Sequence, residues 1–365
     1  MSAPIGVLLV QLGTPDAPTT GAVRRYLSEF LSDPRVIDLA APLRWLLLHA
    51  VILRVRPRAS AAAYQKIWTP QGSPLRVHSE AFSAALAREL GSGFAVALGM
   101  RYGAPPIDAA LRALASAGAT RLLVWPLFPQ HAEASTGSAL ARVFERLQHF
   151  PGYGRVRVLA PCWDDPGFAA AFAAVARPVL DASRPEHVLF SYHGLPERQL
   201  RAADPTGRHC LASDDCCASI SPDNARCYRA QCLATSRALS AALALAPGSH
   251  STSFQSRLGR ARWTRPSTEE TLARLRGSGV RRVAVLCPAF VADCLETLEE
   301  IGIRARERWR ELGGETLALV PSLNADARWV EAAARRVRAA AQGLDSDDAA
   351  ASPDASASAT PMPET

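Results

Sequence analysis

A single histidine stands where a predicted strand ends. His193 closes the apolar run HVLFSYH (187–193), and Gly194 and Pro196 follow it as strand breakers. An imidazole at that place can bond to local backbone, or it can face a cleft and exchange a proton near neutral pH. An aligned run earlier in the chain carries Leu12 at the corresponding position, so the fold does not require a polar side chain there. The alignment favours a chemical role for His193.

Four acidic side chains gather in a second segment. CPAFVADCLETLEEI (287–301) has the pattern of a strand, a turn and then a helix. Asp293 fits a helix N-cap with Glu296 at the capping-box position, and that structural role accounts for both residues. It does not account for Glu299 and Glu300. A carboxylate across a cleft from His193 would suit transient binding of a divalent cation, or proton transfer.

Five of the eight cysteines fall within 23 residues, at Cys210, Cys216, Cys217, Cys227 and Cys232. The surrounding segment, 206–232, is rich in Ser, Asp, Gly and Asn and has no apolar periodicity, so it cannot build a core of its own. Four-thiolate zinc and an iron–sulfur cluster are the candidates that would hold it together in a reducing compartment. Free thiols or disulfides are the remaining alternative. Cys162 and Cys287 have the pattern of small core residues.

The elements that must position these residues form an α/β pattern. Helical patterns such as PPIDAALRALASAG and STEETLARLRGSG alternate with short apolar runs. The runs are almost continuously apolar, as in parallel strands that are covered on both faces. They predict strands at 6–12, 94–100, 121–128, 155–161, 187–193 and 282–290. Strand–helix–strand order implies parallel sheets with right-handed crossovers.

An internal repeat divides the chain into two similar Rossmann-like halves. VLLVQLGTP (7–15) aligns with VLFSYHGLP (188–196), and ALRALASAGATRLLVWPLF (110–128) aligns with TLARLRGSGVRRVAVLCPAF (271–290). We therefore predict an N-terminal half at 1–150 and a C-terminal half at 151–340. Ligands of open parallel sheets bind beyond the carboxyl ends of the strands. A cleft between the halves would bring together the segments around Leu12, His193 and Glu296.

Composition excludes several classes of protein. With 48% hydrophobic residues the chain can bury a large core, so wholesale disorder is excluded. The formal charge is +7, and five acidic residues and no lysine or arginine lie in 344–365. The body of the chain is therefore basic, which invites anionic partners, but its arginines are scattered and we expect no nucleic acid. From about 343 to 365 the composition predicts a disordered acidic tail.

One apolar stretch is exceptional. LRWLLLHAVILRV (43–55) is 13 residues long and contains Arg44, His49 and Arg54. A bilayer crossing needs about 20 apolar residues, so this stretch does not span a membrane. We expect residues 39–55 to form an apolar lip over the ligand pocket, or an ordinary buried helix, with peripheral membrane contact as a further role. The N-terminus has no basic start before its apolar run, which predicts no export signal and a cytoplasmic protein.

Several motifs together make the sequence similar to ferrochelatases, enzymes that insert ferrous iron into a porphyrin in haem synthesis. The similarity covers about residues 5–335 and follows the order of the family's motifs. The motifs are VQLGTPDAP (10–18), RRYLSEFLSDPRVID (24–38), YQKIW and GSPL (within 64–75), PLFPQHAEASTGS (126–138), SYHGLP (191–196), FQSRLGRARW (254–263) and CPAFVADCLETLEEI. The resemblance implies a chelatase-like fold with its active-site cleft between the two halves.

The resemblance also implies roles for particular residues. His193 matches the family's active-site histidine, a proton acceptor and ligand on the metal side, and Glu296 matches its partner carboxylate on the opposite side of the pocket. Leu12 and Trp263 match apolar contacts of the porphyrin, and Lys66 matches a basic residue that meets a porphyrin propionate. One departure is Cys294, which stands where many animal relatives carry a second histidine.

For the cysteine segment, the resemblance implies an insertion relative to shorter family members. Some bacterial ferrochelatases hold a [2Fe–2S] cluster on an internal cysteine-rich segment. The animal ligand set is absent, since Glu133 replaces its loop cysteine and the C-terminal region has no cysteine. We therefore expect a [2Fe–2S] cluster, with zinc as the alternative. The expected ligands are Cys210, Cys217, Cys227 and Cys232, and Cys216 could replace Cys217.

The sequence thus predicts an enzyme, a lyase that inserts Fe2+ into protoporphyrin IX to give haem. Metallation removes two pyrrole protons, which suits a base whose pKa lies near 7, such as His193. Two alternatives stay open at this stage. One is a carrier that binds a tetrapyrrole or metal on the same fold without catalysis. The other is a chelatase for coproporphyrin, or for another metal such as cobalt with a corrin precursor.

Overall fold

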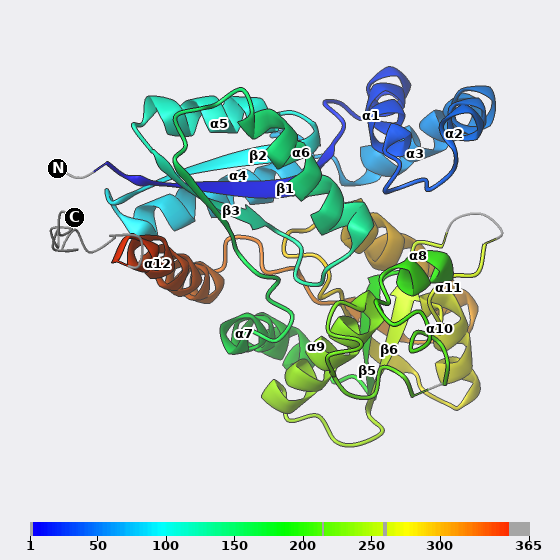
Figure 1. Ribbon diagram of the computed structural model, residues 1–365. Coiled ribbons are helices and arrows are strands. Elements are labelled where there is room, and N and C mark those ends of the chain that lie inside the picture. The colour runs from blue at the N-terminus through cyan, green and yellow to red at the C-terminus, as the bar shows by residue number, and fades with distance from the viewer. Residues whose placement is uncertain (1–2, 214, 258–260, 350–365) are drawn as a thin grey trace, which may run out of the picture.

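Two four-stranded parallel sheets form the centre of the molecule (Figure 1). The computed structural model describes residues 3–213, 215–257 and 261–349. The first sheet has the order β2-β1-β3-β4, with β1 at Ile5–Thr14, β2 at Phe94–Gly103, β3 at Arg121–Pro126 and β4 at Arg155–Val158. The second has the order β6-β5-β7-β8, with β5 at His187–His193, β6 at His250–Gln255, β7 at Arg282–Leu286 and β8 at Thr316–Leu319.

The two sheets have equivalent topology, as the internal repeat predicts. In each sheet the first strand along the chain is central and pairs with the next two, so β1 corresponds to β5. Leu8 and Leu9 of β1 are fully buried, and so are Leu189 and Phe190 of β5. Helices on both faces remove these side chains from water, which is why the strands are continuously apolar. The predicted α/β fold with two parallel sheets is confirmed.

The sequence pattern did not indicate β6 and β8. β6 has the sequence HSTSFQ, whose hydroxyl side chains and single aromatic residue do not form an apolar run. Both strands lie at edges of the second sheet, where one side of the ladder is unpaired and the apolar requirement is weaker. The six strands that the sequence did predict correspond to β1, β2, β3, β4, β5 and β7.

Helices of the first half cover its sheet and extend beyond one end of it (Figure 1). α1, α2 and α3 lie together at that end, separate from α4, α5 and α6. The bounds are Thr20–Ser32 for α1, Ala41–Leu46 for α2, Leu53–Ile67 for α3, Pro74–Leu90 for α4, Ile107–Ser116 for α5 and Ser138–Leu147 for α6. Two π-helical turns lie among them, η1 at Leu47–Ile52 and η2 at Glu133–Gly137.

The segment that we expected to form a lip, 39–55, consists of α2, η1 and the start of α3, and we keep the name lip for it. Leu48 and Leu53 are buried against Leu31 of α1, so one face of the lip packs on the first half. The other face is exposed, with Trp45 at 63% and Val55 at 70% of full exposure. The structure therefore contains neither a fully buried helix nor a spanning one at 39–55. Among the described residues, no helix is long and apolar enough to cross a membrane.

Helices of the second half lie around its sheet, except that the last one, α12, lies beside the first sheet (Figure 1). Their bounds are Pro166–Ser183 for α7, Glu197–Ala202 for α8, Tyr228–Ala242 for α9, Thr268–Gly277 for α10, Arg306–Glu311 for α11 and Ala327–Ala349 for α12. A π-helix, η3 at Glu296–Ala305, precedes α11. α10 begins with the capping box that its sequence suggests, formed by Ser267 and Glu270.

The last helix returns to the first half. Trp329 of α12 stacks on Phe82 of α4 at a centroid distance of 5.8 Å and meets Trp125 of β3 edge-on at 5.9 Å. Phe168 of α7 packs on the same indole at 5.8 Å, so one continuous core joins the halves. α12 runs to Ala349, beyond residue 343 where we expected the tail to begin. The rest of that predicted tail, 350–365, lies outside the described residues.

Candidate active site

The candidate site lies where the second sheet ends. His193 closes β5 and is in register with Gln255, which closes β6. The Gly194 N–H donates to the Gln255 carbonyl at 2.8 Å, and Gln255 Nε2 donates to the Glu296 carbonyl at 2.9 Å. Gln255 is buried and therefore rigid. It fixes the histidine and the glutamate relative to each other through a single residue.

The two candidate groups come from neighbouring strands of one sheet. His193 ends β5, and Glu296 begins η3 shortly after β7, the neighbour of β5 in the same sheet. Both residues belong to the second half, as its predicted bounds of 151–340 imply. The parallel order of the second sheet is enough to bring the two segments to one edge.

The orientation of the His193 ring follows from its hydrogen bonds. Nδ1 lies 2.7 Å from the Gly194 carbonyl oxygen, which can only accept, so Nδ1 carries the proton. In the neutral imidazole the remaining nitrogen, Nε2, then has the free lone pair. Tyr228 Oη donates to the His193 carbonyl at 2.8 Å, and the Phe290 ring lies edge-on to the imidazole. The side chain is a fixed, half-buried base.

Trp263 lies beside this histidine. A Cβ on Gly194 would come within 3.3 Å of the Trp263 ring and 2.8 Å of the Gln255 carbonyl. Gly194 is therefore required by close approach of two neighbours, and the indole is next to the strand end that carries His193. Pro196 and Trp263 form an isolated antiparallel bridge. Residues 258–260 of the motif that contains Trp263 lie outside the described residues.

The three glutamates of η3 have different partners. Glu300 accepts from the Ser256 N–H at 2.8 Å and from the Ser256 hydroxyl at 2.5 Å. Glu299 is buried and pairs with Lys66 of α3 and with Arg304. Glu296 is half-buried and forms no ion pair with any residue that the structure describes. Its carboxylate is thus the one least occupied by structural contacts, and its backbone is the one tied to the strand end of His193.

Asp293 does not cap this helix. Its carboxylate accepts from the Ser322 N–H at 3.1 Å, from Asn324 Nδ2 at 2.8 Å and from the Thr297 hydroxyl at 3.0 Å. The residue before η3 makes no side-chain cap, so the predicted capping box with Glu296 is wrong. The physical reason is that the loop between β8 and α12 supplies donors to the Asp293 carboxylate. Asp293 thus joins the loop after β7 to the loop between β8 and α12, and Glu296 takes no part in these hydrogen bonds.

Cys294 is a neutral thiol beside the site. Burial raises the pKa of Cys294 well above its usual range, and the carboxylate of Glu296 raises it further. The Cys294 N–H donates to the Thr297 hydroxyl at 3.0 Å, which fixes the residue in place. Without a bound cation the thiol therefore stays protonated at neutral pH.

The first half contributes two buried tyrosines that sequence reasoning missed. Burial raises the pKa of Tyr26 well above its usual range, with Tyr64 and Glu296 as further causes. Burial and Glu296 likewise raise the pKa of Tyr64. Both phenols are neutral and lie close enough to sense the Glu296 charge. Tyr26 Oη donates to the Gly13 carbonyl at 3.1 Å. Gly13 follows Leu12 near the end of β1, and Leu12 is half-buried.

Lys66 connects the two halves. Its ammonium lies 3.2 Å from Glu299 Oε1, and its side chain is 47% exposed whereas that of Glu299 is 3% exposed. The structure therefore gives Lys66 a carboxylate partner within the protein. This contact joins α3, which contains the end of the lip, to η3, the helix that begins with Glu296.

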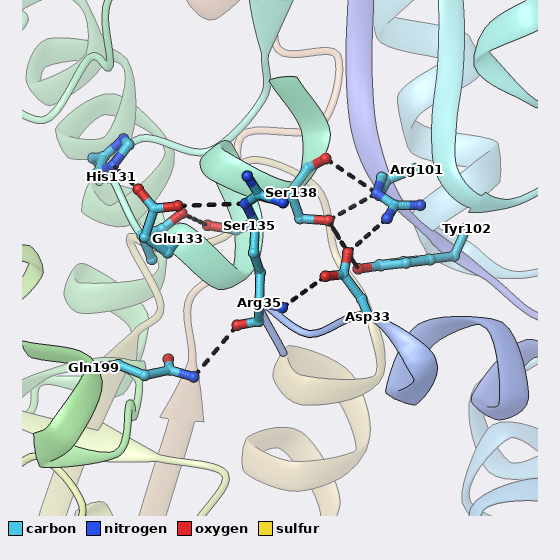
Figure 2. A network of polar contacts seen from close by, with 10 residues as sticks. Asp33, Arg35, Arg101, Tyr102, His131, Glu133, Ser135, Ser138 and Gln199 are labelled. Carbon is cyan, nitrogen blue, oxygen red and sulfur yellow. Dashed lines mark hydrogen bonds and ion pairs between the residues drawn. The ribbon is translucent and has the colours of Figure 1, made fainter. Parts of the chain in front are cut away.

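A polar network fixes the segment that leads into the lip (Figure 2). Asp33 accepts from Arg101 at 2.6 Å, from Tyr102 at 2.9 Å and from Ser138 at 2.5 Å. Burial alone would raise the pKa of Asp33, but these hydrogen bonds and the Arg101 charge lower it below its ordinary value. Because β2 and α6 supply these donors, the start of the lip is anchored to the first half.

α8 of the second half also contacts the segment that leads into the lip. Gln199 of α8 donates to the Arg35 carbonyl at 3.4 Å, and Arg35 pairs with Glu133 at 3.6 Å (Figure 2). Arg198 of α8 forms a two-pronged ion pair with Asp38. α8 begins a few residues after His193. Its contacts with Arg35 and Asp38 therefore join the end of β5 to the segment that leads into the lip.

Three thiols of the cysteine segment are in contact. Cys217 Sγ lies 3.6 Å from Cys216 Sγ and 3.9 Å from Cys227 Sγ. Burial raises the pKa of Cys210 to about 11, and the nearby thiols of Cys216 and Cys217 raise it as well. Cys232 is fully buried in the core beside Tyr228, and its pKa is raised by burial.

All eight cysteines are free thiols. Over the residues that the structure describes, no group of three or more His, Cys, Asp or Glu side chains is arranged to hold a metal ion. The described residues between 203 and 227 form turns rather than helices or strands. Cys162 and Cys287 are buried in the cores, as expected for small apolar residues.

The fold, with its two four-stranded parallel sheets, is chelatase-like. SirB from Bacillus subtilis with Fe3+ matches with a TM-score of 0.52 at 14% identity, over 94% of this chain and 98% of that one. The sirohydrochlorin chelatase SirB from Bacillus subtilis subspecies spizizenii, in complex with cobalt, gives a TM-score of 0.51 at 12% identity over 94% and 97%. At these identities the likeness concerns the fold alone.

Sequence comparison is more specific. The ferrochelatase family profile matches residues 4–341. Ferrochelatase of Azotobacter vinelandii (strain DJ) is 49% identical over 334 residues, which is 91% of this chain and 98% of that protein. Ferrochelatase of Coxiella burnetii (strain Dugway 5J108-111) is 46% identical over 338 residues, or 93% and 94%. The chain belongs to the ferrochelatase family, and its activity is the insertion of iron into a porphyrin for haem synthesis.

Proposed function

We propose that this ferrochelatase uses His193 as the proton acceptor and Glu296 as its carboxylate partner, with protoporphyrin IX as the porphyrin. The observation that supports this is the ring orientation of His193. Nδ1 is held by the Gly194 carbonyl, so Nε2 is the basic nitrogen. Gln255 joins that strand end to the backbone of Glu296, so base and carboxylate keep a fixed relation.

The roles follow from the chemistry of metallation. Two pyrrole N–H protons leave the ring as Fe2+ enters, so the protein must accept protons near the macrocycle. Nε2 of His193 accepts the first, and the free carboxylate of Glu296 offers an oxygen ligand to the arriving Fe2+ and a second proton acceptor. A general base of this kind contributes about 10²- to 10⁴-fold to a rate.

The porphyrin would lie against apolar groups from both halves. Leu12 lies near the end of β1, and Trp263 packs beside Gly194, so each half supplies one apolar wall. A rigid apolar pocket can bend a planar macrocycle and expose its nitrogen lone pairs, with strain of about 1–5 kcal/mol. Lys66 would meet a propionate only by sharing its ammonium with Glu299, which already binds it.

The experiment is anaerobic haem formation from Fe2+ and protoporphyrin IX. We expect His193→Ala to lower kcat by about 10²- to 10⁴-fold. The matched control is His149→Ala, an exposed histidine just after α6, which should leave the rate unchanged. A His193→Ala variant with the wild-type rate would refute the mechanism. A protein that binds porphyrin tightly but forms no haem would instead support the carrier alternative.

The porphyrin itself is tested by competition. Initial rates on protoporphyrin IX and coproporphyrin III are compared at equal concentration, because the two rings differ in the number of carboxylates at the rim. A higher kcat/KM for protoporphyrin IX supports the proposal. A preference for coproporphyrin assigns the chain to the other substrate, and the same assay with Co2+ tests the choice of metal.

We also propose that the cysteine segment binds a [2Fe–2S] cluster. The support is that Cys216, Cys217 and Cys227 are in contact, with Cys210 nearby, in a segment that has no larger core of its own. Cys210, Cys217, Cys227 and Cys232 are the proposed ligands, and Cys216 could replace Cys217. When bound, the cluster would cross-link the segment to the start of α9, next to Tyr228.

Anaerobically purified protein distinguishes the metal. A brown protein with equal amounts of iron and acid-labile sulfide supports the cluster, whereas a colourless protein with stoichiometric zinc contradicts it. Cys216→Ser and Cys217→Ser are compared for retained iron, because only one of them should be a ligand. Cys162→Ser serves as the matched control, since Cys162 is a buried cysteine outside the segment 206–232.

Finally, we propose a cytoplasmic enzyme whose lip makes peripheral contact with a membrane. A reducing compartment is where cysteines serve as free thiols or metal ligands rather than as disulfides. The exposed apolar face of the lip, with Trp45 and Leu46, suits shallow insertion among lipid headgroups. Co-sedimentation with vesicles, reduced in a Trp45→Ser/Leu46→Ser variant, is the expected result. Equal sedimentation of variant and wild type would contradict the contact.

A further inference from the structure

The exposed apolar surface is concentrated in the lip. Seven large hydrophobic side chains are exposed among the described residues, and six of them lie between 39 and 55. Those six are Leu39, Leu43, Trp45, Leu46, Val51 and Val55. A patch of this kind on one small helical layer marks an interaction surface rather than ordinary surface composition.

A basic cavity lies next to this patch. Its volume is about 630 Å³, which is within the range of ligand pockets. It opens between α1 and the second part of the lip, and its lining is Arg24, Arg25, Ser28, Glu29 and Ser32 of α1, His49 of η1, and Leu53 and Arg54 of α3. No residue proposed for catalysis lines it.

The charges of this cavity are only partly balanced within the protein. Arg24 and Arg54 form no ion pair with any described residue. Arg25 lies 3.7 Å from Asp16, and both side chains are more than half exposed, so that contact is weak. Glu29 is the single acidic lining residue, and it accepts the Gly103 N–H at 3.0 Å. Three guanidinium groups therefore face one carboxylate that is already bonded.

The basic cavity and the apolar patch are parts of one surface. Arg54 precedes the exposed Val55, and His49 lies between the exposed Leu46 and Val51. The His49 ring also contacts Trp45, at a centroid distance of 5.0 Å. An amphiphile whose chain contacts the patch would thus have its polar head close to Arg24 and Arg54.

We propose that this cavity binds the phosphate headgroup of an acidic phospholipid, which the lip brings to it. The proposal rests on the membrane contact of the lip proposed above and adds a specific headgroup site to it. Guanidinium groups bind phosphate oxygens in pairs of hydrogen bonds, and Ser28 supplies a hydroxyl on the same wall. A free phosphate would use the same donors, but only a lipid also uses the apolar residues beside them.

The test measures binding of the full chain to vesicles of phosphatidylcholine alone, or of phosphatidylcholine mixed with phosphatidylglycerol. The wild type should bind the mixed vesicles more tightly. Arg24→Gln/Arg54→Gln should weaken that binding by about fivefold for each guanidinium removed, or about 30-fold together. The matched control is Arg112→Gln/Arg237→Gln, which removes the same charge from exposed positions on α5 and α9. The control should lose much less affinity.

Each outcome decides one question. If the Arg24/Arg54 variant binds mixed vesicles like the control variant, the headgroup site is refuted, although the lip contact stands. If Trp45→Ser/Leu46→Ser binds vesicles like the wild type, the lip contact itself fails. Thermal stabilisation by inorganic phosphate, lost in the Arg24/Arg54 variant while vesicle binding is unchanged, would identify a site for free phosphate and overturn the lipid. Haem formation in detergent should be unchanged in the Arg24/Arg54 variant.

Discussion

Tyr228→Phe tests whether the position of the base depends on the helix that follows the cysteine segment. Tyr228 Oη donates to the His193 carbonyl at 2.8 Å, and the ring is buried, so phenylalanine removes the hydroxyl and little else. An uncharged hydrogen bond contributes about 0.5–1.5 kcal/mol. If that contribution holds His193 where it accepts the proton, kcat falls by about three- to tenfold, since about 1.4 kcal/mol corresponds to a factor of ten.

The matched control for this prediction is Tyr192→Phe. Tyr192 precedes His193 on β5, is fully buried, and shares a hydrogen bond of 2.9 Å with Ser236 rather than with the site. Both variants should lose about 1 kcal/mol of unfolding free energy, because each loses one buried hydrogen bond. Only Tyr228→Phe should lower kcat.

The assay is steady-state haem formation combined with urea unfolding of the same preparations. A structural role for Tyr228 predicts equal losses of stability and unchanged kcat in both variants. That result would refute the inference that α9 positions the catalytic histidine. A lower kcat in Tyr192→Phe as well would show that the rate follows general stability and not the contact with His193.

Three further predictions concern other contacts. Gly194→Ala places a Cβ within 2.8 Å of the Gln255 carbonyl, so kcat should fall at least about tenfold while the protein stays folded by circular dichroism. Lys66→Met should cost about 1 kcal/mol in urea unfolding, and the loss should vanish in a Glu299→Gln background if their ion pair is its cause. The pKa of Asp33 is lowered from 3.8, so its stabilisation is present above that pH and lost as pH falls through the lower folded value. Asp33→Asn should therefore unfold with a weaker pH dependence below pH 3.8 in an acid titration.

Each of the three has a clear contrary result. Wild-type kcat in Gly194→Ala would mean that the strand end adapts without moving His193. Equal effects of Lys66→Met in both backgrounds would mean that the lysine acts through packing. An acid transition of the same shape in Asp33→Asn would mean that the network around Asp33 does not set acid stability.

The sequence predicted the central strands because burial on both faces forces them to be apolar. The same logic failed for β6, whose Ser and Thr side chains bond to neighbours on adjacent elements. Ser253, for example, shares a hydrogen bond of 2.9 Å with Thr268. A polar strand satisfied in this way has no signature in hydrophobic periodicity, so it could be found only from the structure.

The site was predictable in its residue types but not in its geometry. His193 could be singled out because a polar group ends an apolar strand. Its partners Gln255 and Tyr228 are far away along the chain and belong to no motif with it, so only folding brings them together. His193 and Glu296 both fall within the predicted second half, but their nearness at one edge of the sheet depends on strand order, since β7 lies beside β5. The internal repeat does not give that order.

The aromatic contact of Trp329 has a consequence for how the protein is made. The indole covers Phe82 and Trp125, yet it is attached to a helix that the ribosome delivers last among the described elements. Until that helix emerges, the nascent first half presents these rings to water and to chaperones. The core that joins the two halves is therefore completed only when this helix has been synthesised, and not when either half of the internal repeat is complete.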